Sequence, residues 1–468
     1  MAVGQVKEIN ASRSNGLMVL GLTSAGSFLV HLSGGIMPLA VPSIMHEFPA
    51  ETAALGTTPT IVWTLIAYMI TFAAVLVPAA KLADVYGHKL FFSLGLVIFT
   101  AFGILSGAAW SIASLLLFRF LQGIGGGMVF VVSMQLLGNV YPSDTPESAT
   151  ALGVWRGFVV GASVLAPAVG GPLTVWLGWR WVSWALVPIA AVVWILSLMW
   201  LKKEEQTTRS QPFDWTGSVL TVASFSLLAV AMAGTRIFGA TSTNTLLLYG
   251  GFVVISILLV LVERTVRAPV LNLSLFRNLP YMAASVATWI VCVGMFAVMM
   301  FVPFFMLYIQ KYQIIPASIA VIPASITAIV FSYVGGHLTN QRGLVIPSVL
   351  GFLLVAAGFL LPTSRSPPTP YSQMLAALVL TWAVMSLPLA PTTVAAIRAV
   401  SKGQIADASG LLNTFHNLGR PTGVGVLGSF LVVTSVSSYN SIFLWAAIVS
   451  LIGAVASFGM RIKQHGAP

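Results

Sequence analysis

The 468-residue chain is poor in charge: 7% of its residues are Asp, Glu, Lys or Arg, whereas 57% are hydrophobic. This composition excludes a water-soluble domain, which needs far more charged surface. The single cysteine, Cys292, excludes an internal disulfide. The chain also lacks a His-Glu-x-x-His zinc motif and a Gly-Lys-Ser/Thr nucleotide loop. Metalloprotease chemistry, ATP-driven transport and bound cofactors are therefore not expected.

Long apolar stretches fill the chain. A helix needs about 20 mainly apolar residues to cross a bilayer, and only elements that satisfy their own backbone hydrogen bonds can do so. The sequence therefore predicts an all-α polytopic membrane protein with fourteen transmembrane helices. The predicted spans are 16–42, 60–81, 89–109, 112–138, 147–172, 180–201, 214–234, 245–264, 281–310, 316–338, 344–362, 372–398, 405–433 and 440–460.

The basic residues predict the orientation. With the N-terminus in the cytoplasm, fifteen of the 22 basic residues fall on the inner side and four fall outside. This asymmetry is the positive-inside rule. It predicts a multi-pass protein of the plasma (inner) membrane with both termini cytoplasmic. The net charge of +11 then reflects topology, so no nucleic-acid partner is expected.

Two loops share a pattern. Residues 80–87 read Ala-Lys-Leu-Ala-Asp-Val-Tyr-Gly, and residues 336–343 read Gly-His-Leu-Thr-Asn-Gln-Arg-Gly. Each follows the second span of a possible six-helix unit, as in transporters built from two related halves. A chance match of two short turns is the alternative. Gly87 would permit a sharp turn, and we expect Asp84 at the start of a helix, where the dipole favours it.

The repeat predicts the organisation of the chain, namely two six-helix bundles and two additional spans. The predicted parts are a cytoplasmic N-terminus (1–15), an N-terminal bundle (16–201), linkers with two extra spans (202–280), a C-terminal bundle (281–460) and a cytoplasmic C-terminus (461–468).

The predicted spans hold basic groups but no acid near a midplane. Arg119, Arg156 and Arg420 fall inside spans 4, 5 and 13, with His31 in span 1 and His416 in span 13. Charged groups in spans usually face a bundle interior or a watered cavity, and they are functional candidates. Structural alternatives remain, because arginines can bind helix carbonyls or extend toward the headgroups, and a neutral histidine can simply pack.

Positive charge without negative charge favours an anionic or neutral polar cargo, since an arginine can hold a carboxylate or phosphate with two hydrogen bonds. If protons take part, histidine is the remaining side chain with a suitable unperturbed pKa. His31 and His416 are then the candidates for a proton role.

Six segments together resemble the major facilitator superfamily and, within it, the fourteen-span drug:proton antiporter branch. The segments are 80–89, 116–123, 166–171, 178–181, 213–217 and 408–414. The resemblance implies alternating access between two bundles, a loop with Leu82, Asp84 and Gly87 that latches them on the cytoplasmic side, and a proton-coupling role for Arg119. It also implies an exporter motif at Pro167, Gly170 and Gly171.

The departures from that pattern concern coupling. The branch carries an aspartate in span 1, where this sequence has Ser33, and Ala80, Val85 and Ala166 replace other usual motif residues. The resemblance and the missing enzyme motifs together predict a secondary transporter and not an enzyme. The expected activity is proton-coupled export of small amphipathic or anionic organic compounds. The alternatives are an uncoupled facilitator or importer of an organic anion and a lipid translocase.

Overall fold

The computed structural model describes residues 2–141, 146–201, 214–238, 242–266, 269–363, 371–401, 404–428, 430–432 and 434–460. The predicted linker 202–213 and C-terminal tail 461–468 lie outside the described residues. So does Asp144, which was predicted to lie on the inner side.

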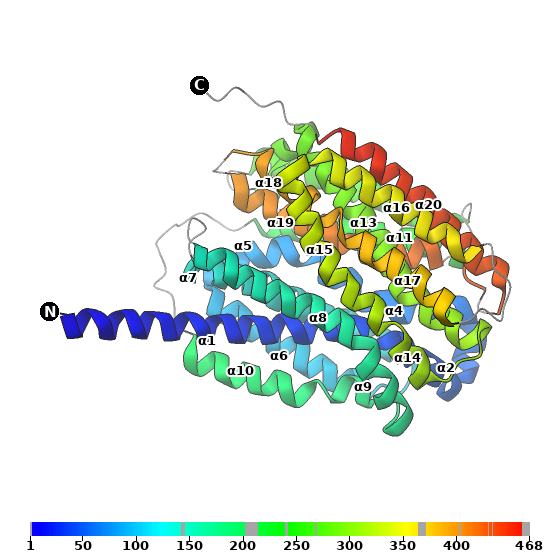
Figure 1. Ribbon diagram of the computed structural model, residues 1–468. Coiled ribbons are helices and arrows are strands. Elements are labelled where there is room, and N and C mark those ends of the chain that lie inside the picture. Colours follow the sequence, from blue (N-terminus) through cyan, green and yellow to red (C-terminus); the bar gives the residue numbers. More distant parts are fainter. Residues whose placement is uncertain are drawn as a thin grey trace.

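The first half of the chain forms helices packed side by side (Figure 1). Its elements are α1 (Ala2–Gly35), η1 (Met37–Leu39), α2 (Val41–Glu47), α3 (Pro49–Leu55), α4 (Thr57–Ala74), α5 (Leu76–Tyr86), α6 (His88–Gly107), α7 (Ile112–Val140), α8 (Pro146–Trp176), α9 (Trp181–Trp184) and α10 (Val187–Trp200).

The second half begins with a helix pair and continues with further helices. Its elements are α11 (Trp215–Ile237), α12 (Thr243–Thr265), η2 (Leu273–Arg277), α13 (Leu279–Phe304), η3 (Phe305–Ile309), α14 (Ile314–Ala320), α15 (Ile322–Arg342), α16 (Val345–Thr363), α17 (Tyr371–Ser386), α18 (Leu389–Arg398), α19 (Ile405–Thr422), η5 (Gly423–Leu427) and α20 (Val436–Phe458).

The all-helical fold agrees with the prediction, and each predicted span coincides with a helix or a broken helix. In the part of the chain that the structure describes, nine helices are long and apolar enough to cross a membrane. The number rises to ten if the bent pair Pro49–Leu55 and Pro59–Ala74 is one span. The chain is a multi-pass membrane protein, and the count of fourteen crossings stays a prediction.

Prolines explain where helices break inside predicted spans. Span 1 was expected to run to residue 42, but α1 ends at Gly35 and a 3-10 turn containing Pro38 follows. Span 2 is interrupted at Val75, between α4 and α5. The proline ring clashes with the carbonyl four residues earlier, which for Pro78 is that of Ala74, the last residue of α4.

The same helix–helix contacts recur in the two halves of the chain. In the first half α1 contacts α8, α4 contacts α7, α6 contacts α7, and α10 contacts α6; the corresponding pairs in the second half are α13 with α19, α15 with α17, α16 with α17, and α20 with α16. The halves meet where α4 contacts α19 and where α8 contacts α14 and α15. This correspondence supports the two-bundle division, whose boundaries at 16–201 and 281–460 remain our proposal.

In both segments of the repeat a helix ends at a glycine with positive φ. Gly87 ends α5 with φ of 104°, and Gly343 ends α15 with φ of 77°. Only glycine adopts this left-handed region without strain. The expectation for Asp84 was wrong: it lies in the last turn of α5 and not at a helix start. Its Oδ1 accepts from His88 Nε2 (3.1 Å) and from Gln135 Nε2 (2.9 Å), within its own half.

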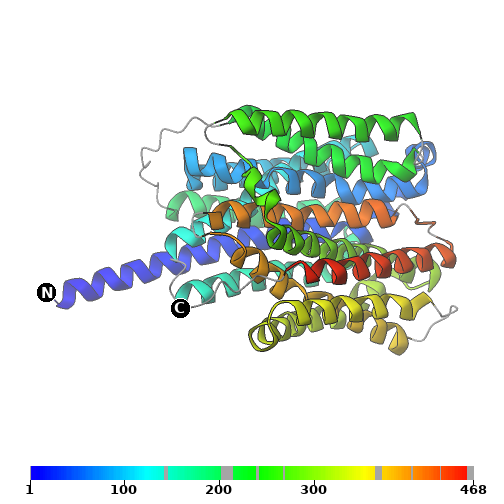
Figure 2. The same cartoon turned by 90° about the horizontal axis from the view of Figure 1, so that it is seen from above.

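The additional pair α11 and α12 lies at one edge of the molecule, as the two bright green helices at the top of Figure 2 show. The two helices pack on each other, and α11 contacts both α4 of the first half and α19 of the second. Asp214 caps the N-terminus of α11 by accepting from the Gly217 N–H at 2.7 Å. The pair therefore lies along the junction of the two halves.

Candidate functional site

Arg119 on α7 is held by the first half of the chain. It is 1% exposed, and its Nη1 donates to Ser33 Oγ and Gln122 Oε1, both at 2.9 Å. Its Nη2 donates to the Ser33 carbonyl at 2.9 Å. The guanidinium also lies 4.7 Å from the centroid of the Tyr68 ring. Charge-assisted hydrogen bonds and a cation–π contact thus offset the cost of burial.

The glycine-rich sequence of α7 brings these groups together. A Cβ at Gly123 would collide with the Tyr68 carbonyl, and one at Gly126 would collide with the Tyr68 hydroxyl. The missing side chains let α7 approach α4 closely. Tyr68 donates to the Val30 carbonyl at 2.8 Å, which ties α4 to α1 as well.

Ser33 therefore lies where the resemblance would place an acid, and it is in direct contact with Arg119. The two were singled out separately from the sequence, and the structure brings them together. A neutral hydroxyl accepts the hydrogen bond that a carboxylate could accept, so the guanidinium keeps its positive charge without an acidic partner at this position.

His31 lies one turn from the Arg119 site. It is 3% exposed, and its Nδ1 is 2.9 Å from the Ser27 carbonyl. Its ring packs against Phe72 and Phe130, with centroids 5.5 Å and 4.8 Å away. Nε2 is buried and has no hydrogen-bond partner among the described residues. The imidazole thus has one nitrogen available to a proton or ligand.

Arg420 on α19 belongs to the second half and reaches the same centre. It is 7% exposed, and its guanidinium lies 4.5 Å from the Phe296 centroid and 5.6 Å from the Phe72 centroid. Phe72 is also the ring that His31 contacts. Arg420 Nε is buried without a hydrogen-bond partner in the described part of the chain. Two aromatic rings thus lie against this cation.

His416 lies one turn before Arg420 on α19 and is half-buried. Its Nδ1 is 3.2 Å from the sulfur of Cys292, the single cysteine of the chain. Arg420 and Arg156 both lie within electrostatic reach of His416. Two imidazoles and two arginines, drawn from both halves, therefore share one region, which we call the central site: His31, Arg119, His416 and Arg420.

Arg156 lies inside α8, and its side chain has accessible surface. Added Cβ atoms at the neighbouring Gly153, Gly157 and Gly161 would meet nothing within 4 Å. Open space therefore lies beside this part of α8, and Arg156 is also within electrostatic reach of His416 of the second half, so its place in the site stays a prediction.

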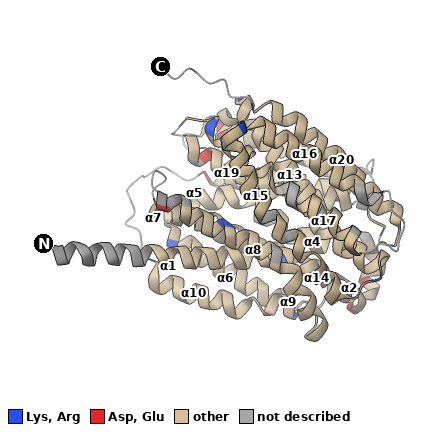
Figure 3. Ribbon diagram, in the orientation of Figure 1, with Lys and Arg blue, Asp and Glu red and all other residues tan. Residues whose placement is uncertain are grey.

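The described carboxylates lie toward the ends of the helices, as the red segments of Figure 3 show. The acids with described side chains are Glu47, Glu51, Asp84, Glu147, Asp214, Glu263 and Asp407, each in a connection or near a helix terminus. The central site therefore has positive charge and no acidic residue in the described structure.

Ion pairs join elements at the two ends of the molecule. At the predicted inner end, Lys81 Nζ lies 3.0 Å from Asp407 Oδ1, which joins α5 to α19 across the two halves. Asn272 Nδ2 donates to the other oxygen of Asp407 at 3.2 Å. At the predicted outer end, Arg180 Nη1 lies 2.6 Å from Glu47 Oε2. Each pair joins residues that the charge pattern had assigned to one side.

The exporter-motif glycines lie at the predicted outer end of α8. A Cβ on Gly170 would come within 2.6 Å of the Ile36 carbonyl oxygen, and one on Gly171 within 2.6 Å of Ser318 Oγ. Ser318 belongs to α14 in the second half. Pro167 lies inside α8 one turn earlier. Gly171 therefore allows the two halves to touch at this end, and Gly170 allows α8 to approach Ile36 of its own half.

Residues 23–420 match the profile of the Major Facilitator Superfamily. The chain belongs to this superfamily. The multidrug resistance protein Stp of Mycobacterium tuberculosis (strain CDC 1551 / Oshkosh) is 29% identical over 418 residues, which cover 89% of this chain and 76% of Stp. The multidrug transporter protein MdtP of Bacillus subtilis (strain 168) is 28% identical, covering 89% of this chain and 75% of MdtP.

A third relative, the tetracenomycin C resistance and export protein of Streptomyces glaucescens, is 26% identical over 86% of this chain and 74% of its own. Among solved structures, a D-xylose–proton symporter has a TM-score of 0.69 at 13% identity, covering 94% of this chain and 97% of its own. The nucleoside transporter NupG has a TM-score of 0.63 at 14% identity, covering 94% and 99%. The structural likeness shows the fold, and the superfamily makes this protein a membrane transporter.

Several residues of the site and of the contact between the two halves were not predicted from the sequence. Lys81, not Asp84, makes the bond from the 80–89 loop to the second half. Its position in that loop was the available signal, but no local pattern indicated Asp407 as the partner, 326 residues away. Phe296 was among the aromatic residues of the spans that could line a cavity, with packing as the alternative, whereas Phe72 gave no signal because aromatic residues in spans usually serve packing.

A buried carboxyl pair was also overlooked. Glu263 is 4% exposed, and neither of its oxygens makes a hydrogen bond of good geometry, although the Val270 and Leu271 backbones lie nearby. A Cβ on Gly217 would meet a carboxyl oxygen of both Glu263 and Asp214, so the two acids flank one glycine. Glu263 is therefore a buried acid beside a second carboxyl group. Among the described residues, no group of three or more His, Cys, Asp or Glu could hold a metal ion.

Proposed function

We propose that this superfamily member is a secondary active exporter of small amphipathic or anionic organic compounds. In this proposal it lies in the plasma membrane with both termini cytoplasmic. It works by alternating access between the two bundles, and the proton gradient drives it. It belongs, on this view, to the fourteen-span drug:proton antiporter branch.

The observation that carries the cargo class is the Arg420 guanidinium. It is buried between Phe72 and Phe296, and no described acid pairs with it. A buried charge without a partner is costly, and an anionic group on the cargo would supply the missing partner through charge-assisted hydrogen bonds. The aromatic rings suit an apolar or planar body beside that anionic group.

Contacts between the halves support alternating access. Lys81–Asp407 closes the predicted inner end, and the contact of Gly171 with Ser318 closes the predicted outer end. Breaking one set while keeping the other would expose the central site to one side at a time. The direction of transport rests on the exporter motif and on the relatives, one of which is named a resistance and export protein.

Proton coupling rests on titratable groups without complete hydrogen bonding. His31 has a buried free Nε2, and His416 shares its Nδ1 with the Cys292 sulfur. Glu263, buried beside Asp214, is a further place where a proton can bind, and Lys81 lies within its electrostatic reach. These sites differ in position, so replacing each one separately identifies the coupling group.

The second candidate is an uncoupled facilitator or importer of an organic anion. The neutral Ser33 beside Arg119 favours it, because no acid is present at the point where the branch has one. A lipid translocase is a third possibility. It would place a lipid phosphate on Arg420 and on Arg156, whose side chain has accessible surface on α8.

The test is cargo-evoked proton movement in proteoliposomes that contain a pH-sensitive dye. Matched panels of organic anions and cations of similar shape are supplied, with transport of labelled compound measured in parallel. We expect anions to be transported with proton movement, and the double variant His31→Gln/His416→Gln and the single variant Glu263→Gln separate the two possible proton sites. Anion transport without any proton movement would support the facilitator. Transport of cations alone would contradict the assigned cargo class.

A further inference from the structure

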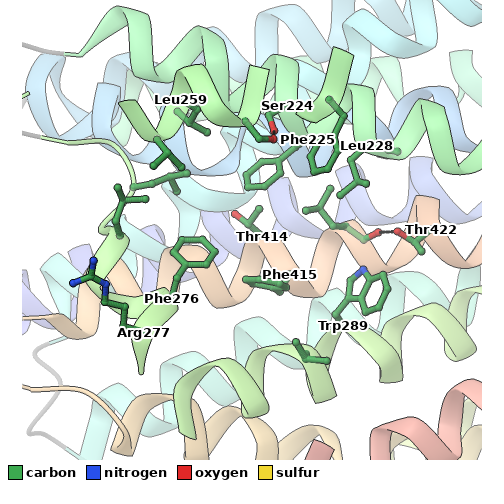
Figure 4. A pocket seen from close by; sticks show the side chains of 18 of the residues that line it. Ser224, Phe225, Leu228, Leu259, Phe276, Arg277, Trp289, Thr414, Phe415 and Thr422 are labelled. Atoms are coloured by element: carbon green, nitrogen blue, oxygen red, sulfur yellow. Dashed lines mark hydrogen bonds between the residues drawn. The ribbon is translucent and has the colours of Figure 1, made fainter. Parts of the chain in front are cut away.

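A cavity of about 820 Å³ lies away from the central site, between the additional helix pair and the second half. It is bounded by α11 and α12 on one side, by α13 and α19 on the other, and by η2 at one end. This volume is in the range of small-molecule sites. Figure 4 shows aromatic and aliphatic side chains pointing into it from these helices.

The walls of the cavity are mostly apolar side chains, and the hydroxyl groups among them already form hydrogen bonds within the protein. Ser224 and Ser256 hydrogen bond to each other at 2.8 Å. Thr414 and Thr422 donate to carbonyls of their own helix at 3.1 Å and 2.7 Å. The remaining wall is built from residues such as Phe225. An occupant of this part of the cavity therefore needs a hydrocarbon body.

Two arginines stand at one end. Arg277 lies opposite the end formed by Trp289 and Thr422 (Figure 4). Arg264, in the last turn of α12, also lines the cavity. Both side chains are exposed, and neither forms an ion pair or hydrogen bond with another described residue. The adjacent Glu263 is buried on a different face of α12.

The position of the two arginines indicates which class of ligand the cavity binds. They lie at the predicted inner end, at the level of the headgroups of the inner leaflet. This leaflet carries anionic lipids, and basic pockets between membrane helices on this side suit their headgroups. Phe276, Arg264 and Arg277 line the cavity and are exposed, so the cavity is open at this end.

We infer that this cavity is a binding site for an anionic phospholipid, with an acyl chain between α11–α12 and α13–α19 and the phosphate on Arg264 and Arg277. The inference is independent of the transported cargo. The opposite face of α19 carries His416 and Arg420, while Phe415 and Leu418 line the cavity. A bound lipid therefore contacts the helix that brings the second half's charge to the central site.

The test is lipid binding to the purified full chain in detergent, by native mass spectrometry with phosphatidylglycerol and phosphatidylcholine of identical chains. We expect phosphatidylglycerol to bind at least tenfold more tightly, as two arginines near a headgroup imply. The preference should disappear in Arg264→Ala/Arg277→Ala. It should persist in Arg342→Ala/Arg398→Ala, a control that removes two exposed arginines from the same predicted side but outside the cavity.

A second variant, Val260→Trp, fills the cavity and leaves both arginines in place, so it should weaken binding of both lipids. Free glycerol phosphate should not compete, because it lacks the hydrocarbon body. Equal binding of the two lipids by the unmodified chain, or equal losses in the cavity and control variants, would overturn the inference. Displacement of phosphatidylglycerol by transported anions would also overturn it, since the cavity would then hold cargo.

Discussion

Replacing Arg420 by methionine separates a functional cation from a structural one, with Arg119→Met as the matched control. Both arginines are buried, and the Nε of each has no hydrogen-bond partner in the described structure. Arg119 makes three hydrogen bonds through its other nitrogens, to Ser33 and Gln122, whereas Arg420 makes none with the described residues. Methionine keeps a long unbranched side chain and removes the charge, so the two substitutions delete the same group from a hydrogen-bonded and a non-hydrogen-bonded environment.

The expected stabilities differ in direction. Arg119→Met removes three charge-assisted hydrogen bonds and leaves buried acceptors unpaired, which costs about 3 kcal/mol or more. Arg420→Met loses two aromatic contacts worth about 1 kcal/mol each, but it also removes an unpaired buried charge whose desolvation costs several kcal/mol. We therefore expect the apparent Tm of Arg420→Met to be unchanged or raised, and that of Arg119→Met to fall clearly.

Although Arg420→Met should leave the stability unchanged or raise it, we expect it to lower the affinity for the cargo. Losing a charged hydrogen-bond donor to an anion costs about 2–3 kcal/mol, which corresponds to roughly 30-fold or more in apparent cargo affinity. Tm comes from tryptophan fluorescence of the purified protein, and affinity from transport into proteoliposomes. If Arg420→Met lowers Tm as much as Arg119→Met does, and anion transport is intact, then Arg420 is a packing residue and the assigned cargo class fails.

Three further perturbations test other parts of the structure. Ser33→Asp should place a carboxylate against Arg119 and make transport more pH-dependent; an unchanged pH profile contradicts a coupling role for this position. Lys81→Met breaks an exposed ion pair worth about 0.2–1 kcal/mol, so maleimide labelling of the buried Cys292 should accelerate up to about fivefold, and an unchanged rate means that the pair does not limit access. Glu47 at the predicted outer end has a pKa held below its ordinary value of 4.5 chiefly by the hydrogen bond from the Arg180 guanidinium. The contribution of Glu47 to stability is therefore present above pH 4.5 and should be lost as the pH falls through the lowered pKa. Glu47→Gln should flatten this part of the Tm–pH curve.

The helices were predictable because their signal is local. A run of about 20 apolar residues specifies a membrane helix without reference to the rest of the chain. The glycines of the two loops were predictable for the same reason, and Gly87 and Gly343 share a positive φ. The contact between Arg119 and Gln122 also follows from a spacing of three residues on one helix.

The composition of the central site was only partly predictable. Arg420 is recognisable as a buried cation from its depth in span 13, but its neighbours Phe72 and Phe296 come from opposite halves. Their meeting depends on how the bundles dock, and no local pattern encodes that. Arg156 shows a related limit: depth along a helix does not reveal which face of the helix is covered, and the surface of α8 around Arg156 borders open space.

The charges of the central site constrain how protons can drive export. A proton on His31 or His416 adds positive charge near Arg420, and this increases the affinity for an anion. By linkage the anion then increases proton affinity equally. Two ligands that favour each other travel together, whereas antiport requires them to compete. Proton-driven export of an anion therefore needs a proton site away from the cargo. The buried pair of Asp214 and Glu263, beside the junction of the halves and within electrostatic reach of Lys81, meets that requirement better than either histidine.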